Sequence, residues 1–139
     1  MSEATTQSAA KSIEACMSKW AAAVRNRDMV GIRADHDANM LMFDLPGPLL
    51  LRGLDAYMES WDQFFDWSRK PVAFDFTDVE VTAGEDVGFA TAIGHCSGLT
   101  SDAQREDLTF RLTMGFRKID ASWRIVHEHH SLPAEKSGL

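Results

Sequence analysis

The spacing of hydrophobic positions changes once along the chain, near Pro71. Before that point, apolar residues recur at steps of three and four, which is typical of amphipathic helices. This spacing predicts a long helix from Thr6 to Arg27, a short second helix capped by Asp28, and a third helix that starts at Leu54 and ends before Pro71. The first half of the chain is therefore expected to be mainly helical.

The second half follows the period of β-strands. After the third predicted helix, apolar residues alternate with their neighbours. Tight turns predicted at residues 84–86 and 120–121, with a polar loop at residues 98–106, divide this half into three or four long antiparallel strands. One more short strand is expected at residues 39–44, where Pro46-Gly47-Pro48 ends it.

This order of elements predicts an α+β fold, with N-terminal helices packed in a strongly curved antiparallel sheet. The expected domain is single and spans residues 1–139. Helices do not fill a strongly bent sheet completely, so a cavity is expected between the first helix, the third helix and the concave face. The other face of the sheet would expose an apolar patch, which favours association, so we expect a homodimer packed through it.

Composition and charge restrict the partners. With 139 residues, 45% of them hydrophobic, the chain can form one core. The net charge of −7 disfavours nucleic acid and anionic lipid. Apolar stretches are far shorter than the roughly 20 residues that cross a bilayer, and no secretory signal is recognisable. We therefore expect a cytoplasmic protein whose partner is a small organic molecule, hydrophobic or polar, with no nucleic acid and no membrane.

The third predicted helix carries large aromatic side chains on one face, among them Trp61 and Phe65. Core packing explains such residues, and the alternative is that both also wall a ligand cavity. The cysteines, Cys16 and Cys96, are expected to be buried free thiols. Neither belongs to a closely spaced Cys/His set of the kind that binds structural zinc.

Histidines are the main candidates for chemistry. His127 and His129 are two apart in the last predicted strand, so their side chains should share a face. If that face is concave, both enter the cavity, where His95 could join them; unperturbed histidine has a pKa of about 6.5 and carries protons at neutral pH. Arg111 could then hold an anionic group or an oxyanion, and Asp44 could serve as a base or orient an imidazole.

Other roles remain open for these residues. Histidines near a strand end often bind backbone or solvent, and Arg111 could pair with Glu128 across strands. His36 and His130 are expected to be solvated surface residues. A zinc or iron site built from His127 and His129 with His95 or Asp44 is a further alternative, but a His-x-His pair is not diagnostic, and we predict no metal and no cofactor.

Two segments resemble a known family. They are Phe43-Asp44-Leu45-Pro46-Gly47, which leads through Arg52-Gly53 into the aromatic helix, and the final Trp123-Arg124-Ile125-Val126-His127-Glu128-His129-His130-Ser131. Together they are similar to SnoaL-like and ketosteroid-isomerase-like proteins of the nuclear transport factor 2-like superfamily, which share a cone-shaped, cystatin-like fold. Arg111 and Thr113 lie where such proteins often place Arg-x-Thr, which implies a substrate-binding role for both.

The resemblance implies a cofactor-free acid–base isomerase or lyase that acts next to a carbonyl. Asp44 resembles the proton-carrying aspartate of ketosteroid isomerases, although Leu45 separates it from the Pro-Gly loop. The tyrosine that those enzymes place in the first helix has no counterpart, because Tyr57 is the only tyrosine and lies in the third helix. The steroid isomerase mechanism is therefore not expected. Because the fold serves many functions, a non-catalytic ligand-binding or oligomerisation module is the alternative.

Overall fold

The computed structural model describes residues 3–45, 47–68, 73–99 and 105–134. Within these residues the chain forms three helices and six strands. The helices are α1 (Glu3–Arg25), α2 (Met29–Arg33) and α3 (Leu54–Ser68). The strands are β1 (His36–Phe43), β2 (Leu51–Arg52), β3 (Ala73–Ala83), β4 (Val87–Leu99), β5 (Arg105–Ile119) and β6 (Ser122–Ser131).

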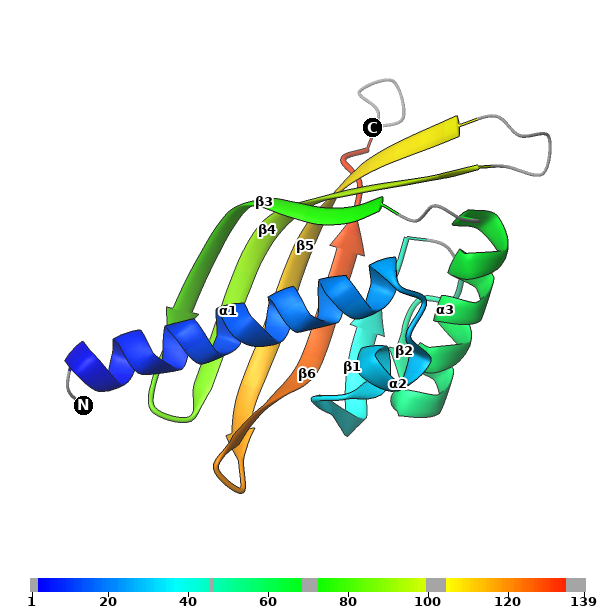
Figure 1. Cartoon of the computed structure of the whole chain (residues 1–139). Helices are drawn as coiled ribbons and strands as arrows, with labels where there is room; N and C mark the ends of the chain where they lie inside the picture. Colours follow the sequence, from blue (N-terminus) through cyan, green and yellow to red (C-terminus); the bar gives the residue numbers. More distant parts are fainter. Residues whose placement is uncertain (1–2, 46, 69–72, 100–104, 135–139) are drawn as a thin grey trace.

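The six strands form one strongly curved sheet in the order β2-β1-β6-β5-β4-β3. Strands β3 to β6 are antiparallel neighbours, whereas β1 runs parallel to β6. Figure 1 shows α1 crossing the concave side of the sheet and α3 standing beside β1 and β2. The predicted α+β fold with helices inside a curved sheet is confirmed, and the parallel β1–β6 pair is the addition that the sequence pattern did not indicate.

Most element boundaries agree with the hydrophobic pattern. The Asp28 side chain caps α2 by accepting a hydrogen bond from the Gly31 amide at 3.0 Å, as predicted. The helix α3 ends at Ser68, and Pro71 lies outside the described residues. Strands β4 and β5 pair as far as Leu99 and Arg105, so the predicted polar loop at residues 98–106 is shorter than expected.

The core lies between α1, α3 and the concave face, with Trp20 of α1 at its centre. Its ring makes edge contacts with Trp61 of α3 and Phe74 of β3 at centroid distances of 5.9 and 5.3 Å, and it stacks on Phe76 at 5.6 Å. Edge-to-face aromatic pairs of this kind add to the stabilisation from burial alone. The amphipathic face of α1 thus positions one aromatic cluster against both the sheet and α3.

A β-bulge at Val126 decides which residues of β6 face the core. Ile125 pairs with Phe116 and His127 with Gly115, so Val126 has no partner on β5. A shift of one residue exchanges the two faces of a strand. Ile125 therefore points inward before the bulge, and Glu128 and His130 are the buried residues after it. His127 and His129 share a face, as predicted, but it is the face opposite to that of Ile125, Glu128 and His130.

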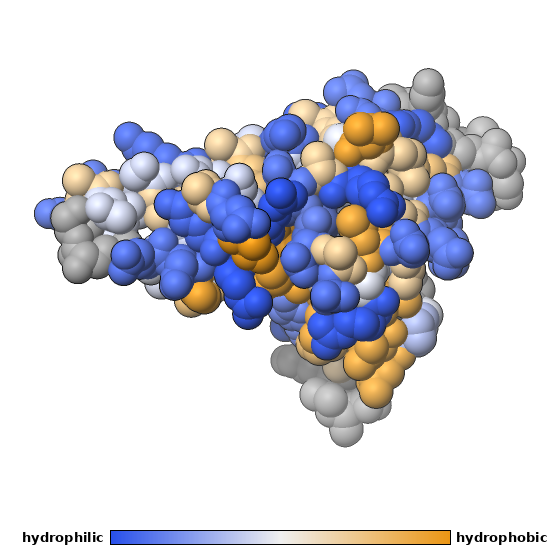
Figure 2. Space-filling view, turned by 90° about the horizontal axis from the view of Figure 1, so that it is seen from below, coloured by the Kyte–Doolittle hydropathy of each residue, from blue (hydrophilic) through white to orange (hydrophobic). Residues whose placement is uncertain are grey.

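The face of the molecule that is seen from below carries both hydrophilic and hydrophobic residues (Figure 2). Figure 2 shows hydrophilic residues over most of the face seen from below, with hydrophobic residues visible between them. Within the described ranges, no helix is long and apolar enough to cross a membrane.

Candidate functional site

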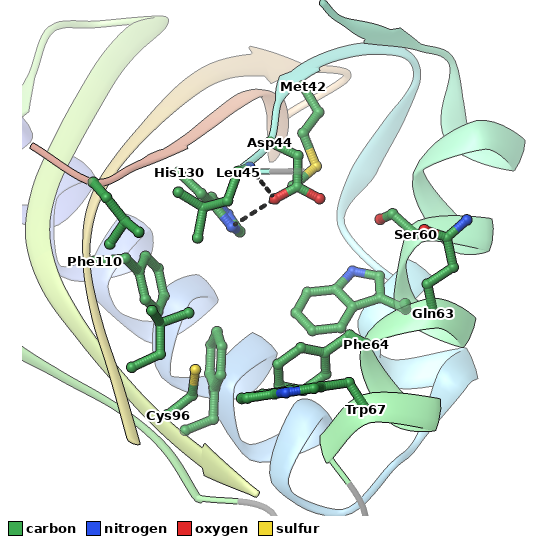
Figure 3. A pocket seen from close by; sticks show the side chains of 14 residues that line it. Met42, Asp44, Leu45, Ser60, Gln63, Phe64, Trp67, Cys96, Phe110 and His130 are labelled. Atoms are coloured by element: carbon green, nitrogen blue, oxygen red, sulfur yellow. Dashed lines mark hydrogen bonds and ion pairs between the residues drawn. The ribbon is translucent and has the colours of Figure 1, made fainter. Parts of the chain in front are cut away.

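A cavity of about 420 Å³ lies between α3, the concave side of the sheet and the end of β1. Its walls are mainly apolar, and their aromatic side chains are Trp61, Phe64 and Trp67 from α3 and Phe74 and Phe110 from the sheet. Polar side chains line it as well. They are Asp44, Ser60, Gln63 and His130. Figure 3 shows Asp44 and His130 on one side of this cavity, opposite Ser60 and Gln63 of α3.

Asp44 follows the last residue of β1 and projects into the cavity, as Figure 3 shows. Its Oδ1 accepts a hydrogen bond from the Leu45 amide at 2.8 Å, which orients the carboxylate. The same oxygen lies 3.8 Å from Nδ1 of His130. The side chain of Asp44 is 19% exposed, so it can reach both a ligand and solvent. The candidate site residue Asp44 thus lies where a ligand would contact it.

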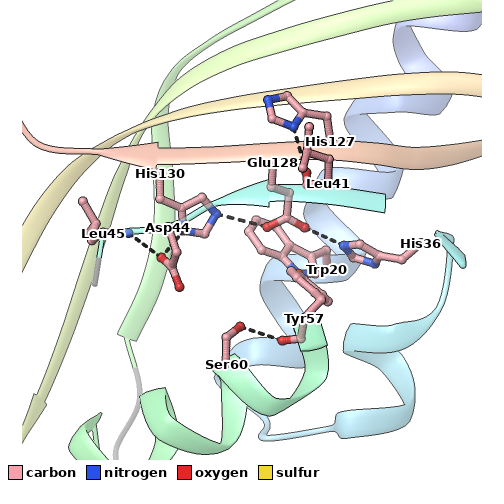
Figure 4. Close-up of polar contacts among 10 residues, drawn as sticks. All are labelled: Trp20, His36, Leu41, Asp44, Leu45, Tyr57, Ser60, His127, Glu128 and His130. Carbon is pink, nitrogen blue, oxygen red and sulfur yellow. Dashed lines mark hydrogen bonds and ion pairs between the residues drawn. The ribbon is translucent and has the colours of Figure 1, made fainter. Parts of the chain in front are cut away.

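His130 belongs to β6 and stands between two carboxylates. Its side chain is only 8% exposed. On the cavity side, Nδ1 faces Asp44, and on the buried side, Nε2 lies 3.0 Å from Oε1 of Glu128. Figure 4 shows the imidazole of His130 between the two acids. This corrects the expectation that His130 is a solvated surface residue, because the bulge at Val126 turns it inward.

Glu128 is fully buried and is bound by a second histidine. Nε2 of His36, the first residue of β1, lies 2.5 Å from Oε2 of Glu128, and neither side chain is exposed. His36 Nδ1 lies 3.2 Å from the carbonyl oxygen of Ala34. His36 is therefore a core residue, contrary to the expectation of a solvated position. The parallel pairing of β1 with β6 brings these residues together.

Two residues from the helices complete the surroundings of Glu128. The Tyr57 hydroxyl of α3 accepts a hydrogen bond from Trp20 Nε1 at 3.0 Å. Complete burial raises the pKa of Tyr57 well above its usual value, and the neighbouring Glu128 carboxylate acts in the same direction. Tyr57 therefore stays a neutral hydroxyl that donates to the carboxylate. The ring of Tyr57 also lies 4.5 Å from that of His36, measured between centroids.

The charge of Glu128 is stabilised in spite of its burial. Burial alone would raise the pKa of the carboxyl, because it disfavours the charged form. Hydrogen bonds from His130 and His36, together with the electrostatic effect of those two residues, outweigh this and lower the pKa to about 2. Glu128 is therefore an ionised acceptor at neutral pH.

The cysteine in the cavity wall is not arranged as a nucleophile. Cys96 of β4 lines the cavity, and burial raises the pKa of its thiol to about 11, with Asp107 acting in the same direction. A protonated thiol is a weak nucleophile. Cys16, in α1, is also buried and free.

Three residues that the sequence suggested for the site lie on the outer face of the sheet. His127 Nδ1 donates to the carbonyl oxygen of Leu41 at 2.7 Å, and the rings of His127 and His129 pack on Phe43. Thr113 is exposed and pairs with His129 in the sheet. His127 and His129 were expected to enter the cavity if their face was concave, and this condition is not met, because the bulge at Val126 places them on the other face.

Three further candidates are also engaged away from the cavity. His95 bonds the hydroxyls of Thr77 and Thr109, at 3.0 and 3.3 Å. Arg111 is exposed and binds Ser131 and the Leu132 carbonyl, both at 3.1 Å, so it does not pair with Glu128. Phe65 lies behind Trp61, where its ring stacks under the Arg27 guanidinium. Only Asp44 and Trp61 of the predicted site residues line the cavity.

The residues that sequence reasoning missed are His36, Glu128 and His130. The segment from His127 to His130 carried a partial signal, because side chains alternate between the two faces of a strand. Either His127 and His129 or Glu128 and His130 therefore face inward, and the pattern does not say which pair does. Nothing in the pattern marks Val126 as a bulge. In the part of the chain that the structure describes, no group of three or more His, Cys, Asp or Glu side chains is arranged to hold a metal ion.

One family model and several solved structures are similar to this chain. The model of the SnoaL-like domain matches residues 13–135. An NTF2-like (nuclear transport factor 2-like) protein of unknown function from Pseudomonas putida KT2440 has a TM-score of 0.85 and 27% sequence identity, with 96% of this chain and 92% of that chain covered. A suggested dehydratase of the NTF2-like family from Streptomyces avermitilis has a TM-score of 0.80 and 13% identity, with 94% and 99% covered.

A protein with a cystatin-like fold from Caulobacter vibrioides has a TM-score of 0.77 and 16% identity, with 94% of each chain covered. At the lower identities these likenesses establish the fold alone. No curated protein is similar enough in sequence to match. The family match confirms the resemblance that the segments at residues 43–47 and 123–131 indicated.

Proposed function

We propose that this chain, which belongs to the SnoaL-like domain family, is a cofactor-free acid–base catalyst that moves a proton next to a carbonyl of a small, largely apolar ligand. One observation carries the proposal. His130 stands in the cavity wall with Nδ1 3.8 Å from Asp44 and with Nε2 bonded to the ionised, buried Glu128. A histidine held in this way beside a carboxylate is the arrangement that proton transfer requires.

The Asp44–His130 pair can take up and release one proton. When the His130 ring is neutral with its proton on Nε2, Nδ1 and the Asp44 oxygen are both acceptors, 3.8 Å apart. A single added proton on Nδ1 satisfies both. In this form His130 is the acid that protonates an oxygen through Nδ1, while Asp44 is the base that removes a proton from carbon. The proton that Asp44 has taken then passes back to the product carbon or to Nδ1 of His130, so the pair supports isomerisation or elimination of water.

The walls of the cavity favour an uncharged ligand with a flat apolar body. Aromatic side chains from α3 and the sheet form most of the lining together with aliphatic side chains. Among the described residues, no lysine or arginine side chain lines the cavity, and Arg111 is bound on the outer face. An anionic ligand would face Asp44 without a compensating cation. The earlier expectation of an anionic group held by Arg111 therefore does not apply to this cavity.

Exchange of carbon-bound hydrogen tests the proposal without knowledge of the natural substrate. The probe is 2-tetralone, an aromatic bicyclic ketone whose C1 protons lie next to the carbonyl. In D₂O, the protein should accelerate loss of the C1 proton signal in the ¹H NMR spectrum beyond the buffer rate. We expect Asp44→Asn and His130→Gln to reduce this rate by roughly 100-fold, the lower end of what a positioned acid–base group contributes.

His129→Gln is the matched control, because His129 directly precedes His130 in β6 and its side chain faces the other side of the sheet. Binding is followed separately through the fluorescence of Trp61 and Trp67 in the cavity wall. Probe binding with no exchange above the buffer rate would contradict catalysis and favour the alternative, a binding protein. Equal losses in the control and in His130→Gln would also contradict the assigned roles.

A further inference from the structure

Three buried residues lie behind His130 and do not belong to the proposed Asp44–His130 pair. His36, Glu128 and Tyr57 surround the side of His130 that faces away from the cavity, and Figure 4 shows His130 and His36 on opposite sides of the Glu128 carboxylate. None of the three lines the cavity. A carboxylate at 0% exposure is costly to maintain unless charges and hydrogen bonds compensate it, and removing one partner of such a pair is strongly destabilising.

The donors and acceptors around His36 determine its protonation. Its Nδ1 faces the carbonyl oxygen of Ala34 and its Nε2 faces Oε2 of Glu128, at 3.2 and 2.5 Å. Both neighbours are acceptors, because a carbonyl oxygen and an ionised carboxylate have no hydrogen to donate. The ring therefore donates from both nitrogens and is an imidazolium. His36 and Glu128 together form a buried ion pair with no net charge.

The same reasoning fixes one proton of His130. Oε1 of the ionised Glu128 only accepts, so Nε2 of His130, 3.0 Å away, carries a hydrogen. The second ring nitrogen, Nδ1, is the one that faces Asp44 and the cavity. The proton that enters and leaves the ring is consequently the one on Nδ1. A histidine base is useful only when the correct nitrogen is free, and a carboxylate behind the ring is a known way to select it.

We propose that Glu128 and His36 are positioning residues: their buried ion pair holds the Nε2 proton of His130 in place, so that Nδ1 is the atom that exchanges a proton with Asp44 and the ligand. The inference rests on the proposed function for its catalytic meaning, but the position of the proton can be measured without any ligand. Without Glu128, the neutral ring would gain more by placing its proton on Nδ1, where the Asp44 carboxylate is the nearby acceptor.

The test is ¹⁵N NMR of the imidazole nitrogens, whose chemical shifts distinguish a protonated from an unprotonated nitrogen. In the ¹⁵N-labelled protein we expect the neutral form of His130 to carry its proton on Nε2. In Glu128→Leu we expect it on Nδ1. His127 is an internal control with the opposite arrangement, because its Nδ1 donates to the Leu41 carbonyl. Its tautomer should be Nδ1–H in both proteins, and His36→Gln and His130→Gln assign the signals.

A neutral His130 ring with its proton on Nδ1 in the unaltered protein would overturn the proposal, and this result needs no variant to fold. Retention of the Nε2 proton in folded Glu128→Leu would overturn it as well. With 2-tetralone, we expect Glu128→Leu to slow C1 exchange by roughly 100-fold, with less than a twofold change in the Kd measured by tryptophan fluorescence. A weaker Kd with an unchanged exchange rate would mean that Glu128 shapes the cavity and does not position His130.

The two proposals fail in different ways. If the unaltered protein exchanges no C1 protons, the acid–base function is contradicted, while the NMR result still decides whether Glu128 sets the tautomer. If exchange occurs but His130 carries its proton on Nδ1, the function stands and the positioning role falls.

Discussion

Nε2 of His36 lies 2.5 Å from Oε2 of Glu128, although 92 residues separate them in the chain. Both side chains are fully buried. The contact exists because β1 runs parallel to β6, which places the first residue of β1 beside the middle of β6. It places an ion pair directly behind the cavity residue His130, and it makes the stability of the fold depend on the charge of Glu128.

The stability of the protein should therefore fall in acid through Glu128. The folded-state pKa of about 2 lies below the ordinary value of 4.5, so the unfolded chain binds more protons between these values. The stabilisation is fully present above about pH 4.5 and is lost as pH falls toward 2. Its full size is on the order of 3 kcal/mol. Urea unfolding at a series of pH values should show this loss in the unaltered protein and not in Glu128→Gln.

The other carboxylates are the same in both proteins, so the difference between the two pH profiles isolates Glu128. Parallel profiles from pH 6 to the acid limit of folding would show that Glu128 has no depressed pKa. The free energy of unfolding at pH 7 should also be lower in Glu128→Gln, because the His36 imidazolium loses its counter-ion.

Tyr57→Phe should destabilise the protein by about 1–3 kcal/mol, the cost of leaving buried polar groups without partners. The substitution removes the acceptor of the Trp20 Nε1 hydrogen bond and the hydroxyl that donates to Glu128. Urea unfolding at pH 7 measures the change. A double-mutant cycle with Trp20→Phe should give a favourable coupling energy between the two residues. Additive losses would show that the Trp20–Tyr57 hydrogen bond contributes nothing.

Gly94→Ala should disturb the cavity wall. A Cβ at Gly94 would lie 2.3 Å from Cζ of Phe110, so the ring, which lines the cavity, must move. Overpacking of this kind costs roughly 1–3 kcal/mol. Thermal unfolding should show the loss, and it should be larger than for Gly115→Ala, where the nearest atom lies 3.3 Å away.

Replacing Phe110 by a smaller residue separates the crowding between the added Cβ at position 94 and the Phe110 ring from the general effect of alanine in a strand. In the background of Phe110→Leu, the cost of Gly94→Ala should become smaller. An unchanged cost would show that Phe110 is not the residue that requires glycine at this position.

The expected homodimer through the outer face of the sheet remains a prediction. Phe89 of β4 is on that face and is 48% exposed, so a partner packed there would cover its ring. Sedimentation velocity should give two copies for the unaltered protein and one for Phe89→Glu. Val30→Glu, on the exposed side of α2, is the matched control and should leave the dimer intact. A monomer at micromolar concentration in the unaltered protein would contradict the prediction.

Local patterns were sufficient for much of the fold. The three- and four-residue spacing identified α1 and α3, Asp28 identified the start of α2, and the change to alternation identified the long strands. Asp44 was a candidate because the segment at residues 43–47 resembles the one that carries the proton-carrying aspartate of ketosteroid isomerases, and the structure places it at the cavity. Each of these inferences depends on residues that are close in the sequence, so the sequence alone determined them.

Only the tertiary structure decided which histidines belong to the site. The bulge at Val126 depends on how β6 pairs with β5, and it exchanges His127 and His129 for Glu128 and His130 on the inner face. The burial of His36 depends on the parallel contact of β1 with β6. Strand register and long-range pairing minimise the free energy of the whole sheet and its core, so a pattern of residues along one strand does not contain them.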